Sequence, residues 1–502
     1  MLKKAFVAPD PGRLRLRFAL RAVVGIGLAV AACGAVGHSL VAAITGGLAA
    51  LLALFTVTDA TVRGQAVTTA LLPVVGLPVL AVAALLHDLP LGRDLAFLAI
   101  VGAGVYARRW GPRGHSLGVF AFMMFFATQF LHTVPGQLPE LYAAVLLSLL
   151  AAFAVRFGLW CYERGLPPAA VPAPPTGTGL ARTTTRQAIQ ATAGSAFALA
   201  TGQVLSHERW YWAVGATWWV FVNTASRGET LVRSFRRALG TVIGVVVGLL
   251  VAVPLDGAAV PTAALVACCV FGIFYTAAVS YTWMMLAVTL MAGLLYGSLG
   301  VLDPDLLVLR VTETTVGALG AALAVLLVLP VTTHATTDAW IQRALRCVHA
   351  CTAEAAARLA GSATADPAPR VAELEALLGR VRMSLAPLVH PLSPLRARKA
   401  RARQVLALLD DCARQVRGLA SIAADPEASH DARLTAACQR VEAAVEALTA
   451  PGEPGERATV LSAAPQPPAA EPALVHLHGL ERALAELATP LRSSPRAPLA
   501  DA

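Results

Sequence analysis

Long hydrophobic blocks fill the chain between residues 18 and 330. They lie near 18–36, 40–57, 66–86, 94–107, 117–133, 141–161, 187–205, 210–225, 238–253, 260–279, 281–299 and 309–330. Most are about 17 to 21 residues long, roughly the length that a helix needs to cross the hydrocarbon core of a bilayer. The pattern predicts an all-α membrane protein with about twelve transmembrane helices.

The composition agrees with a membrane protein. Hydrophobic residues make up 57% of the 502 residues and charged residues only 14%, against about 25% charged residues in soluble globular chains. The mean hydropathy is +0.65. These values exclude an ordinary soluble domain of this size, whose polar surface would need far more charge.

The twelve blocks fall into two groups of six. A proline- and glycine-rich stretch, LPPAAVPAPPTGTG, separates them and predicts a linker over 166–185 between a first repeat at 1–165 and a second at 186–330. Sliding the chain by about 169 residues places Arg17 on Arg186, and one further residue places Arg63 on Arg233. Six spans return the chain to the same side, so we expect parallel repeats with a pathway at their interface.

After Pro330 the sequence changes to helix-forming alanine, leucine, arginine and glutamate. Helical spacing of apolar residues marks the runs 336–360, 371–387, 395–423, 429–449 and 473–489. Proline-rich breaks separate some of these runs. We predict a cytoplasmic helical domain over 331–502 with a loosely ordered end.

Basic residues indicate the orientation in the membrane. With the N-terminus inside, the inner segments carry most of the lysines and arginines, and the outer ends hold only Arg93, Arg209 and Arg310. This asymmetry predicts a multi-pass plasma (inner) membrane protein with both termini cytoplasmic. Residues 1–330 hold 21 Lys+Arg against 12 Asp+Glu, whereas 331–502 hold 19 against 18. The basic excess therefore belongs to the lipid-embedded part, and we expect no nucleic-acid partner.

The sequence offers little for catalysis or metal binding. The eight cysteines form no CxxC pair and have no histidine at metal-ligand spacing, and the three lysines follow no glycine-rich phosphate loop. We therefore predict no enzyme, no cofactor and no bound metal.

Three stretches of the second repeat carry a family resemblance. They are Arg186 followed by QAIQATAGSAFALATG, the run WYWAVGATWWVFV at 210–222, and RSFRRALGTVIGVVVG at 233–248. The last contains an R-x-x-G-T-x-x-G pattern made by Arg237, Gly240, Thr241 and Gly244. Together they resemble the fusaric-acid-resistance-like (FUSC) family, most specifically over 186–330 and more weakly over 17–160. The resemblance implies a membrane transporter of organic anions, related to exporters of aromatic carboxylic acids and, more distantly, to malate channels.

Arginines at the predicted inner mouth are candidate substrate-binding residues. Arg233 and Arg237 lie one helical turn apart and share a face, and a guanidinium suits a carboxylate. Arg63 and Arg186 would complete a pseudo-symmetric ring. The alternative is that these arginines set the topology and bind anionic lipid headgroups.

Small and aromatic residues of the second repeat allow two interpretations each. Gly240, Gly244 and Gly248 form a stripe that favours close helix packing or lines a narrow pore. Trp210 and Trp212 are typical of an interfacial aromatic belt on the outer side. Two deeper positions are candidates for the substrate site. Trp218 stacks on an aromatic substrate or packs against another helix, and Asn223 bonds a neighbouring helix or the substrate.

Glu313 is the one acid well inside a predicted span, with Arg310 three residues earlier on the same face. Charges within a membrane are costly, so we expect either a structural ion pair or a role in proton coupling.

The resemblance thus implies a transporter of aromatic or other carboxylic acids that works outward, and the hydropathy places it in the lipid bilayer. An organic-anion channel and a membrane scaffold whose tail binds partners remain alternatives. The oligomeric state, including a homo-oligomer, stays open.

Overall fold

The computed structural model describes most of the chain. The described residues are 13–158, 178–222, 224, 227–255, 257–329, 333–360, 362, 364–389, 396–423, 432–449 and 472–492. Most of the predicted linker, Asn223, and the segments 450–471 and 493–502 of the tail lie outside them. The chain divides into two compact units, Met1–Pro330 and Val331–Ala502. Each unit is described by itself.

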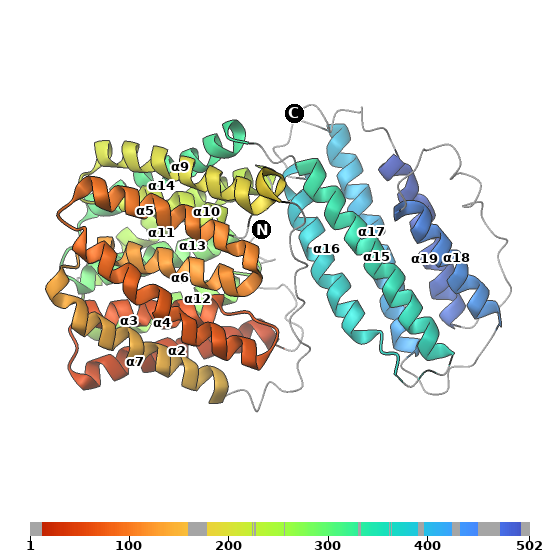
Figure 1. The fold of residues 1–502 in the computed structure, drawn as a ribbon, viewed down its shortest axis with the longest axis horizontal. Helices are drawn as coiled ribbons and strands as arrows, with labels where there is room; N and C mark the ends of the chain where they lie inside the picture. The colour runs from red at the N-terminus through yellow and green to blue at the C-terminus, as the bar shows by residue number, and fades with distance from the viewer. Residues whose placement is uncertain are drawn as a thin grey trace. The chain divides into compact units, whose positions relative to one another are not determined.

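The described part of the first unit contains twelve α-helices (Figure 1). The first six-helix group comprises α2 (Leu14–Val36), α3 (Leu40–Thr56), α4 (Val62–Leu85), α5 (Pro90–Tyr106), α6 (Gly111–Phe130) and α7 (Leu138–Gly158). The second six-helix group comprises α9 (Thr183–Leu205), α10 (Tyr211–Phe221), α11 (Arg227–Leu255), α12 (Ala259–Thr276), α13 (Tyr281–Ser298) and α14 (Pro304–Leu327). Short 3-10 helices accompany them: η2 (Ala107–Trp110), η3 (Pro135–Gln137) and η4 (Gly179–Ala181). The chain is all-helical in the ranges described, as predicted.

Eight segments of the first unit are long and apolar enough to cross a membrane, and one of them, Pro90–Phe130, contains both α5 and α6. Helix α3 is apolar but has only 17 residues. Helix α10 has 11 residues, a length of about 16 Å, or roughly half of the hydrocarbon core. The chain is therefore a multi-pass membrane protein, and α10 is shorter than the span predicted at 210–225.

Helix starts and ends follow local sequence signals. Ser39 and Thr61 accept hydrogen bonds from Ala42 N and Gly64 N and so cap α3 and α4. Asp303 caps α14, and a proline occupies the first position of that helix. Helix α2 ends at Gly37, whose φ of 84° is a left-handed conformation that glycine adopts without strain.

The two six-helix groups pack their helices in matching pairs. In each group the first helix contacts the second and the sixth, the second contacts the sixth, the third contacts the fifth, and the fourth contacts the fifth. Between the groups, α5 packs on α9 and α12 packs on α2, so the fourth helix of each group meets the first helix of the other.

Aromatic rings fill the contact between α5, α6 and α10. Phe97 stacks on Phe122 and Phe125, with ring centroids 5.3 Å and 4.7 Å apart. Phe122 in turn stacks on Trp218, at 3.9 Å. All four side chains are buried, so this cluster joins the first group to the second.

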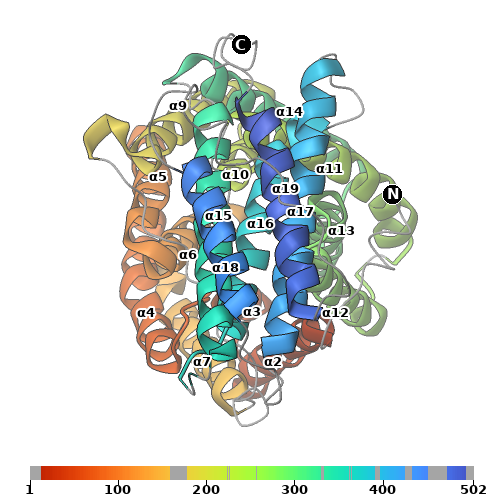
Figure 2. The same cartoon turned by 90° about the vertical axis from the view of Figure 1, so that its right-hand side faces the viewer.

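The second unit contains five described helices, which Figure 2 shows lengthwise and facing the viewer: α15 (Thr333–Leu359), α16 (Ala368–Val389), α17 (Arg396–Ala423), α18 (Ala432–Thr449) and α19 (Pro472–Arg492). Helix α15 packs on α16 and α18, α16 on α17, and α19 on α17 and α18. The core consists of leucine, valine and alanine with the cysteines Cys347, Cys351, Cys412 and Cys438. Burial raises the pKa of the Cys412 thiol to about 12, so this thiol packs as an apolar side chain.

Candidate functional site

A cavity of about 700 Å³ lies between the two six-helix groups. The first group contributes residues of α2, α3 and α6, and the second contributes residues of α10 to α14. Most of the lining is aliphatic or aromatic, which is usual for a pocket that encloses the body of a small ligand.

Two arginines are the charged residues in the part of the cavity lining that the structure describes. Arg237 comes from α11 and Arg310 from α14, and their side chains are 6% and 4% exposed. Among the described residues that line the cavity there is no aspartate or glutamate. The two guanidinium charges interact with each other. We call this space the arginine cavity, and its charge is suited to an anion.

Arg237 is held by α13. Its Nη1 donates to the Tyr281 hydroxyl at 3.2 Å and lies 3.0 Å from the Met285 sulfur. Its Nε has no hydrogen-bond partner. The guanidinium of Arg233 stacks over the Tyr281 ring, 4.0 Å from its centroid. Tyr281 therefore links the two arginines that the sequence placed on one face, and only Arg237 lines the cavity.

Arg310 is held by an aromatic ring. Its guanidinium lies 3.6 Å from the centroid of Trp212, and the Trp212 indole donates to the Tyr296 hydroxyl at 2.8 Å. Cation–π contact of this kind favours a fixed position for the charge. The Nε and Nη1 of Arg310 are buried and have no hydrogen-bond partners among the described residues.

Glu313 does not form the ion pair with Arg310 that the i,i+3 spacing predicted. Its side chain is fully buried and neither carboxyl oxygen has a hydrogen-bond partner. The carboxyl group lies against Gly202 of α9, whereas Arg310 turns to Trp212. The prediction was wrong because spacing fixes which residues are neighbours but not which rotamers they adopt.

The glycine stripe of α11 faces α13. A β-carbon on Gly240 would lie 2.5 Å from the Thr282 carbonyl oxygen, and one on Gly244 would lie 2.7 Å from Thr289 Cβ. At Gly248 the nearest such contact, Leu307 of α14, is at 3.6 Å. Thr241 of the same motif is buried. The first two glycines thus permit the close approach of the helix that holds Arg237 to the helix that carries Tyr281.

The other predicted substrate residues do not join the arginine cavity. Arg63 is exposed at the start of α4. Arg186 donates from Nε to the Leu180 carbonyl at 2.6 Å. Neither lines the cavity. Asn223 lies outside the described residues. The structure therefore brings together Arg233 and Arg237 but not the predicted ring.

The tryptophans are placed differently from the predictions. Trp218 is fully buried in the stack with Phe122, so it packs between helices and does not reach the cavity. Trp210 is also buried, and Trp212 lines the cavity. The predicted interfacial belt is wrong for these two residues. Sequence reasoning missed Trp212, Tyr281 and Tyr296 as partners of arginines, and no local signal distinguishes them from packing aromatics.

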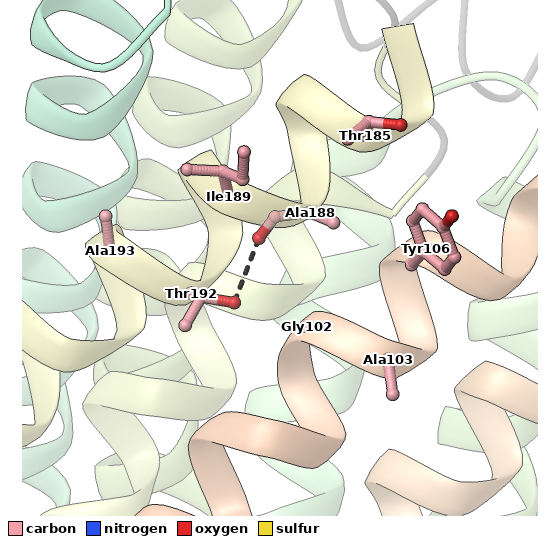
Figure 3. Close-up of a pocket in the computed structure, with 8 residues that line it drawn as sticks. All are labelled: Gly102, Ala103, Tyr106, Thr185, Ala188, Ile189, Thr192 and Ala193. Carbon is pink, nitrogen blue, oxygen red and sulfur yellow. Dashed lines mark hydrogen bonds between the residues drawn. The ribbon is translucent and has the colours of Figure 1, made fainter. Parts of the chain in front are cut away.

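A second, shallower pocket of about 550 Å³ lies between α5 and α9 (Figure 3). Small residues line it, including Gly102, Ala103 and Ala188. The Thr192 hydroxyl within it already donates to the Ala188 carbonyl at 2.9 Å. No charged residue lines this pocket. The described residues also contain no cluster of His, Cys, Asp or Glu that would hold a metal ion. The arginine cavity is therefore the candidate site.

Comparison with known proteins supports the resemblance over part of the chain. Residues 196–324 match the family model described as fusaric acid resistance protein-like. The match covers the helices that supply Trp212, Arg237 and Arg310. Searches of curated proteins and of solved structures find no match.

Proposed function

We propose that this chain, whose residues 196–324 match the fusaric acid resistance protein-like family, transports organic anions through the arginine cavity. The match and the apolar helices indicate a membrane protein of transporter-like kind and not an enzyme. The single observation that carries the anion assignment is that Arg237 and Arg310 line a mostly apolar cavity, with no acid among the described residues of its lining.

The lining favours carboxylates with an apolar body. Trp212, Phe126 and Phe130 offer aromatic surface, and the arginines offer unpartnered N–H donors. A guanidinium binds a carboxylate through charge-assisted hydrogen bonds. Aromatic or other carboxylic acids are therefore the proposed substrates. The family description names resistance to an acid, and transport that confers resistance must export, which supports the outward direction.

We propose the predicted layout for the membrane part. Matching helix pairs in the two six-helix groups, and the reciprocal contacts of α5 with α9 and α12 with α2, support parallel repeats related by a pseudo-two-fold axis. The concentration of arginine at one set of helix ends supports cytoplasmic termini in a plasma membrane. The second unit is then cytoplasmic.

Within this layout Arg233 stands beside the arginine cavity and not in it. Its stacking on Tyr281 leaves it to attract anions toward Arg237 from the cytoplasmic side. Arg63 and Arg186 lie outside the cavity, and in this proposal their positive charge helps to attract anions to the cytoplasmic side.

Flux measurements test the proposal. Purified protein is reconstituted into liposomes, and uptake of labelled benzoate and succinate is measured under a pH gradient and under a voltage. Arg237→Gln and Arg310→Gln each remove a charged hydrogen bond worth roughly 1.5–3 kcal/mol, so we expect flux to fall by about tenfold or more. Arg17→Gln, on the exposed face of α2, is the matched control and should transport normally.

The possible outcomes test separately whether the protein transports anions and whether the arginine cavity is the site. Wild-type flux no greater than that of empty liposomes would contradict transport and favour a scaffold whose tail binds partners. Flux that survives Arg237→Gln and Arg310→Gln would remove the arginine cavity from the pathway. Saturation and exchange between the two sides would distinguish a transporter from a channel.

A further inference from the structure

Two charged residues of α14 stand one turn apart without pairing. Glu313 is fully buried and both of its carboxyl oxygens lack hydrogen-bond partners. Arg310 is 4% exposed and has two nitrogens without partners. Unpaired buried charges are costly, so this separation needs a physical reason.

The surroundings of Glu313 contain no counter-charge. Helices α9, α10 and α11 pack against α14, and the carboxyl lies beside Gly202, close to the Trp210 carbonyl and Ala213. The charged or titratable groups on these helices are Arg186 on α9, Tyr211 on α10, and Arg227, Glu229, Arg233, Arg236 and Arg237 on α11. Tyr211 is engaged with Tyr296 and Arg209. Besides burial, Glu313 is influenced by the backbone of Ala213, which carries no charge, and none of these side chains supplies it with a cation.

This geometry is that of a neutral carboxylic acid. An ionised carboxylate in the same place would lose its water and gain no cation, at a cost of several kcal/mol. The neutral acid avoids that cost. In the state described, Glu313 therefore carries a proton.

Arg310 can reach a second partner without a change in the backbone. Residues at i and i+3 of a helix lie about 5–6 Å apart at Cβ. A change of rotamer would carry the guanidinium from Trp212, now 3.6 Å away, to Glu313. The i,i+3 spacing therefore leaves Glu313 within reach of Arg310, whose guanidinium lies over Trp212 in the structure.

We propose that Glu313 is a proton-binding site that decides whether Arg310 is available to an anion in the arginine cavity. The inference rests on the proposed function. With its proton, Glu313 is neutral, and Arg310 stays over Trp212 and binds the anion together with Arg237. When the proton passes from the carboxyl group to water, the carboxylate attracts Arg310, and the cavity loses one of its two positive charges.

Linkage fixes the sign of the coupling. A proton on Glu313 strengthens anion binding, so a bound anion must strengthen proton binding by the same factor. Proton and anion therefore load and leave together. For a monovalent anion the pair carries no net charge, and an acid that accumulates on one side leaves down its own gradient.

Binding measured against pH tests the inference. Full-length protein in nanodiscs is titrated calorimetrically with benzoate and with succinate between about pH 6.5 and about pH 8.5, where the carboxyl groups of both probes stay largely ionised. Once Glu313 loses its proton, wild-type affinity should fall by up to about tenfold per pH unit. Glu313→Gln, a neutral side chain of the same shape, should keep the high affinity at every pH. Glu208→Gln, an exposed acid in the loop before α10, is the control and should keep the wild-type pH dependence.

Two further measurements sharpen the test. Arg310→Gln should bind weakly at low pH and show little further loss at high pH. At the pH where affinity is high, the infrared band of the neutral Glu313 carboxylic acid should be present in the wild type and absent from Glu313→Gln; in the wild type it should weaken as the pH rises and persist to higher pH when an anion is bound. A wild-type pH dependence that persists in Glu313→Gln overturns the inference and leaves the proposed function standing. Absence of binding to either probe at any pH overturns both.

Discussion

The two six-helix groups share one packing scheme but give the arginine cavity different chemistry. The first group contributes only apolar side chains, from α2, α3 and α6. The second contributes both arginines and Trp212. At the position that the sequence repeat matches to Arg237, the first group has Val67. Under the proposed function, the first group would contact the apolar body of the ligand, and the second group would bind its charge.

A buried arginine of the first group and one of the second differ in how their nitrogens are hydrogen-bonded. Arg156, on α7 of the first group, donates to the carbonyls of Ala53, Leu54 and Val57 at 2.7 Å, 3.2 Å and 3.0 Å. It thus closes the C-terminal end of α3, where carbonyls lack partners within the helix. Arg237 of the second group keeps an unpartnered Nε. Burial alone therefore does not distinguish a structural arginine from the arginines of the proposed site, whereas the hydrogen-bond partners of their nitrogens do.

The largest effect is expected where the groups meet. Trp218 of α10 stacks on Phe122 of α6 with an angle of 6° between the rings, and both are buried. Trp218→Ala should lower the free energy of unfolding by about 3–5 kcal/mol, because it removes a large core side chain. Chemical denaturation in detergent measures it.

Controls for Trp218→Ala come from the same fold. Trp110→Ala, at a side chain that is 65% exposed, should change stability by less than about 0.5 kcal/mol. The double mutant with Phe122→Ala should reveal a coupling of about 0.5–1.5 kcal/mol. A coupling of zero would mean that this stack does not hold the groups together.

Arg156→Gln should destabilise the protein next most strongly. It leaves the carbonyls at the end of α3 without their charged donor, and each such hydrogen bond is worth roughly 1.5–3 kcal/mol. We expect a loss of about 3 kcal/mol in the free energy of unfolding, with benzoate flux per folded molecule unchanged. Arg237→Gln should do the reverse and reduce flux with a smaller loss of stability. Equal patterns in the two variants would break the distinction between a structural and a ligand-binding arginine.

Hydropathy predicted most helices of the first unit but not the end of α10. The apolar block at 210–225 predicted a continuous span, yet the helix ends at Phe221, and Val222 has an extended ψ of 121°. Arg108, from the 3-10 helix η2, donates to the Phe221 carbonyl at 3.1 Å. That donor is more than a hundred residues away in the chain, so the local sequence pattern could not predict where α10 ends.

The candidate site was predicted in part for a similar reason. Arg237 was found because it opens a motif with Gly240 and Gly244. Its partner Tyr281 lies on another helix, and an isolated tyrosine in an apolar block has no distinguishing signal. For Arg310 and Glu313 the spacing gave the right pair of neighbours, but the competition with Trp212 depends on tertiary structure.

Gly240→Ala tests the contact that places Arg237 against α13. The added methyl group would lie 2.5 Å from the Thr282 carbonyl oxygen, a backbone atom that cannot turn aside. Overpacking of this kind costs about 1–3 kcal/mol, although alanine gains up to about 1 kcal/mol in helix propensity. We expect a net loss of stability, measured by thermal unfolding in detergent. The matched control is Gly34→Ala in α2 of the first group, where no atom lies within 4 Å of the added carbon, and it should be neutral or stabilising.

The smallest effect on stability is expected from a histidine in the loop after α6, which lies near charged residues of the loop before α10. His132 follows α6 of the first group. Its pKa is lowered by partial burial and then by the charges of Arg209, from the loop before α10, and of His87, with Glu208 opposing them. Because the folded pKa lies below the ordinary value of 6.5, the unfolded chain binds the proton more readily. Stability should therefore be full above pH 6.5 and fall as the pH drops below it.

His132→Asn should remove this fall in stability at acid pH. Asparagine tolerates the positive φ of 49° at this position, so the backbone is kept. The effect should be well below the roughly 1.4 kcal/mol that one pKa unit represents, because solvent screens an exposed side chain. Unfolding midpoints of wild type and variant are compared at about pH 7.5 and about pH 5.5, on either side of the ordinary histidine pKa. His207→Asn, in the neighbouring exposed loop, serves as the control. An unchanged acid sensitivity in His132→Asn would show that the charge of Arg209 does not act on the first group at this contact.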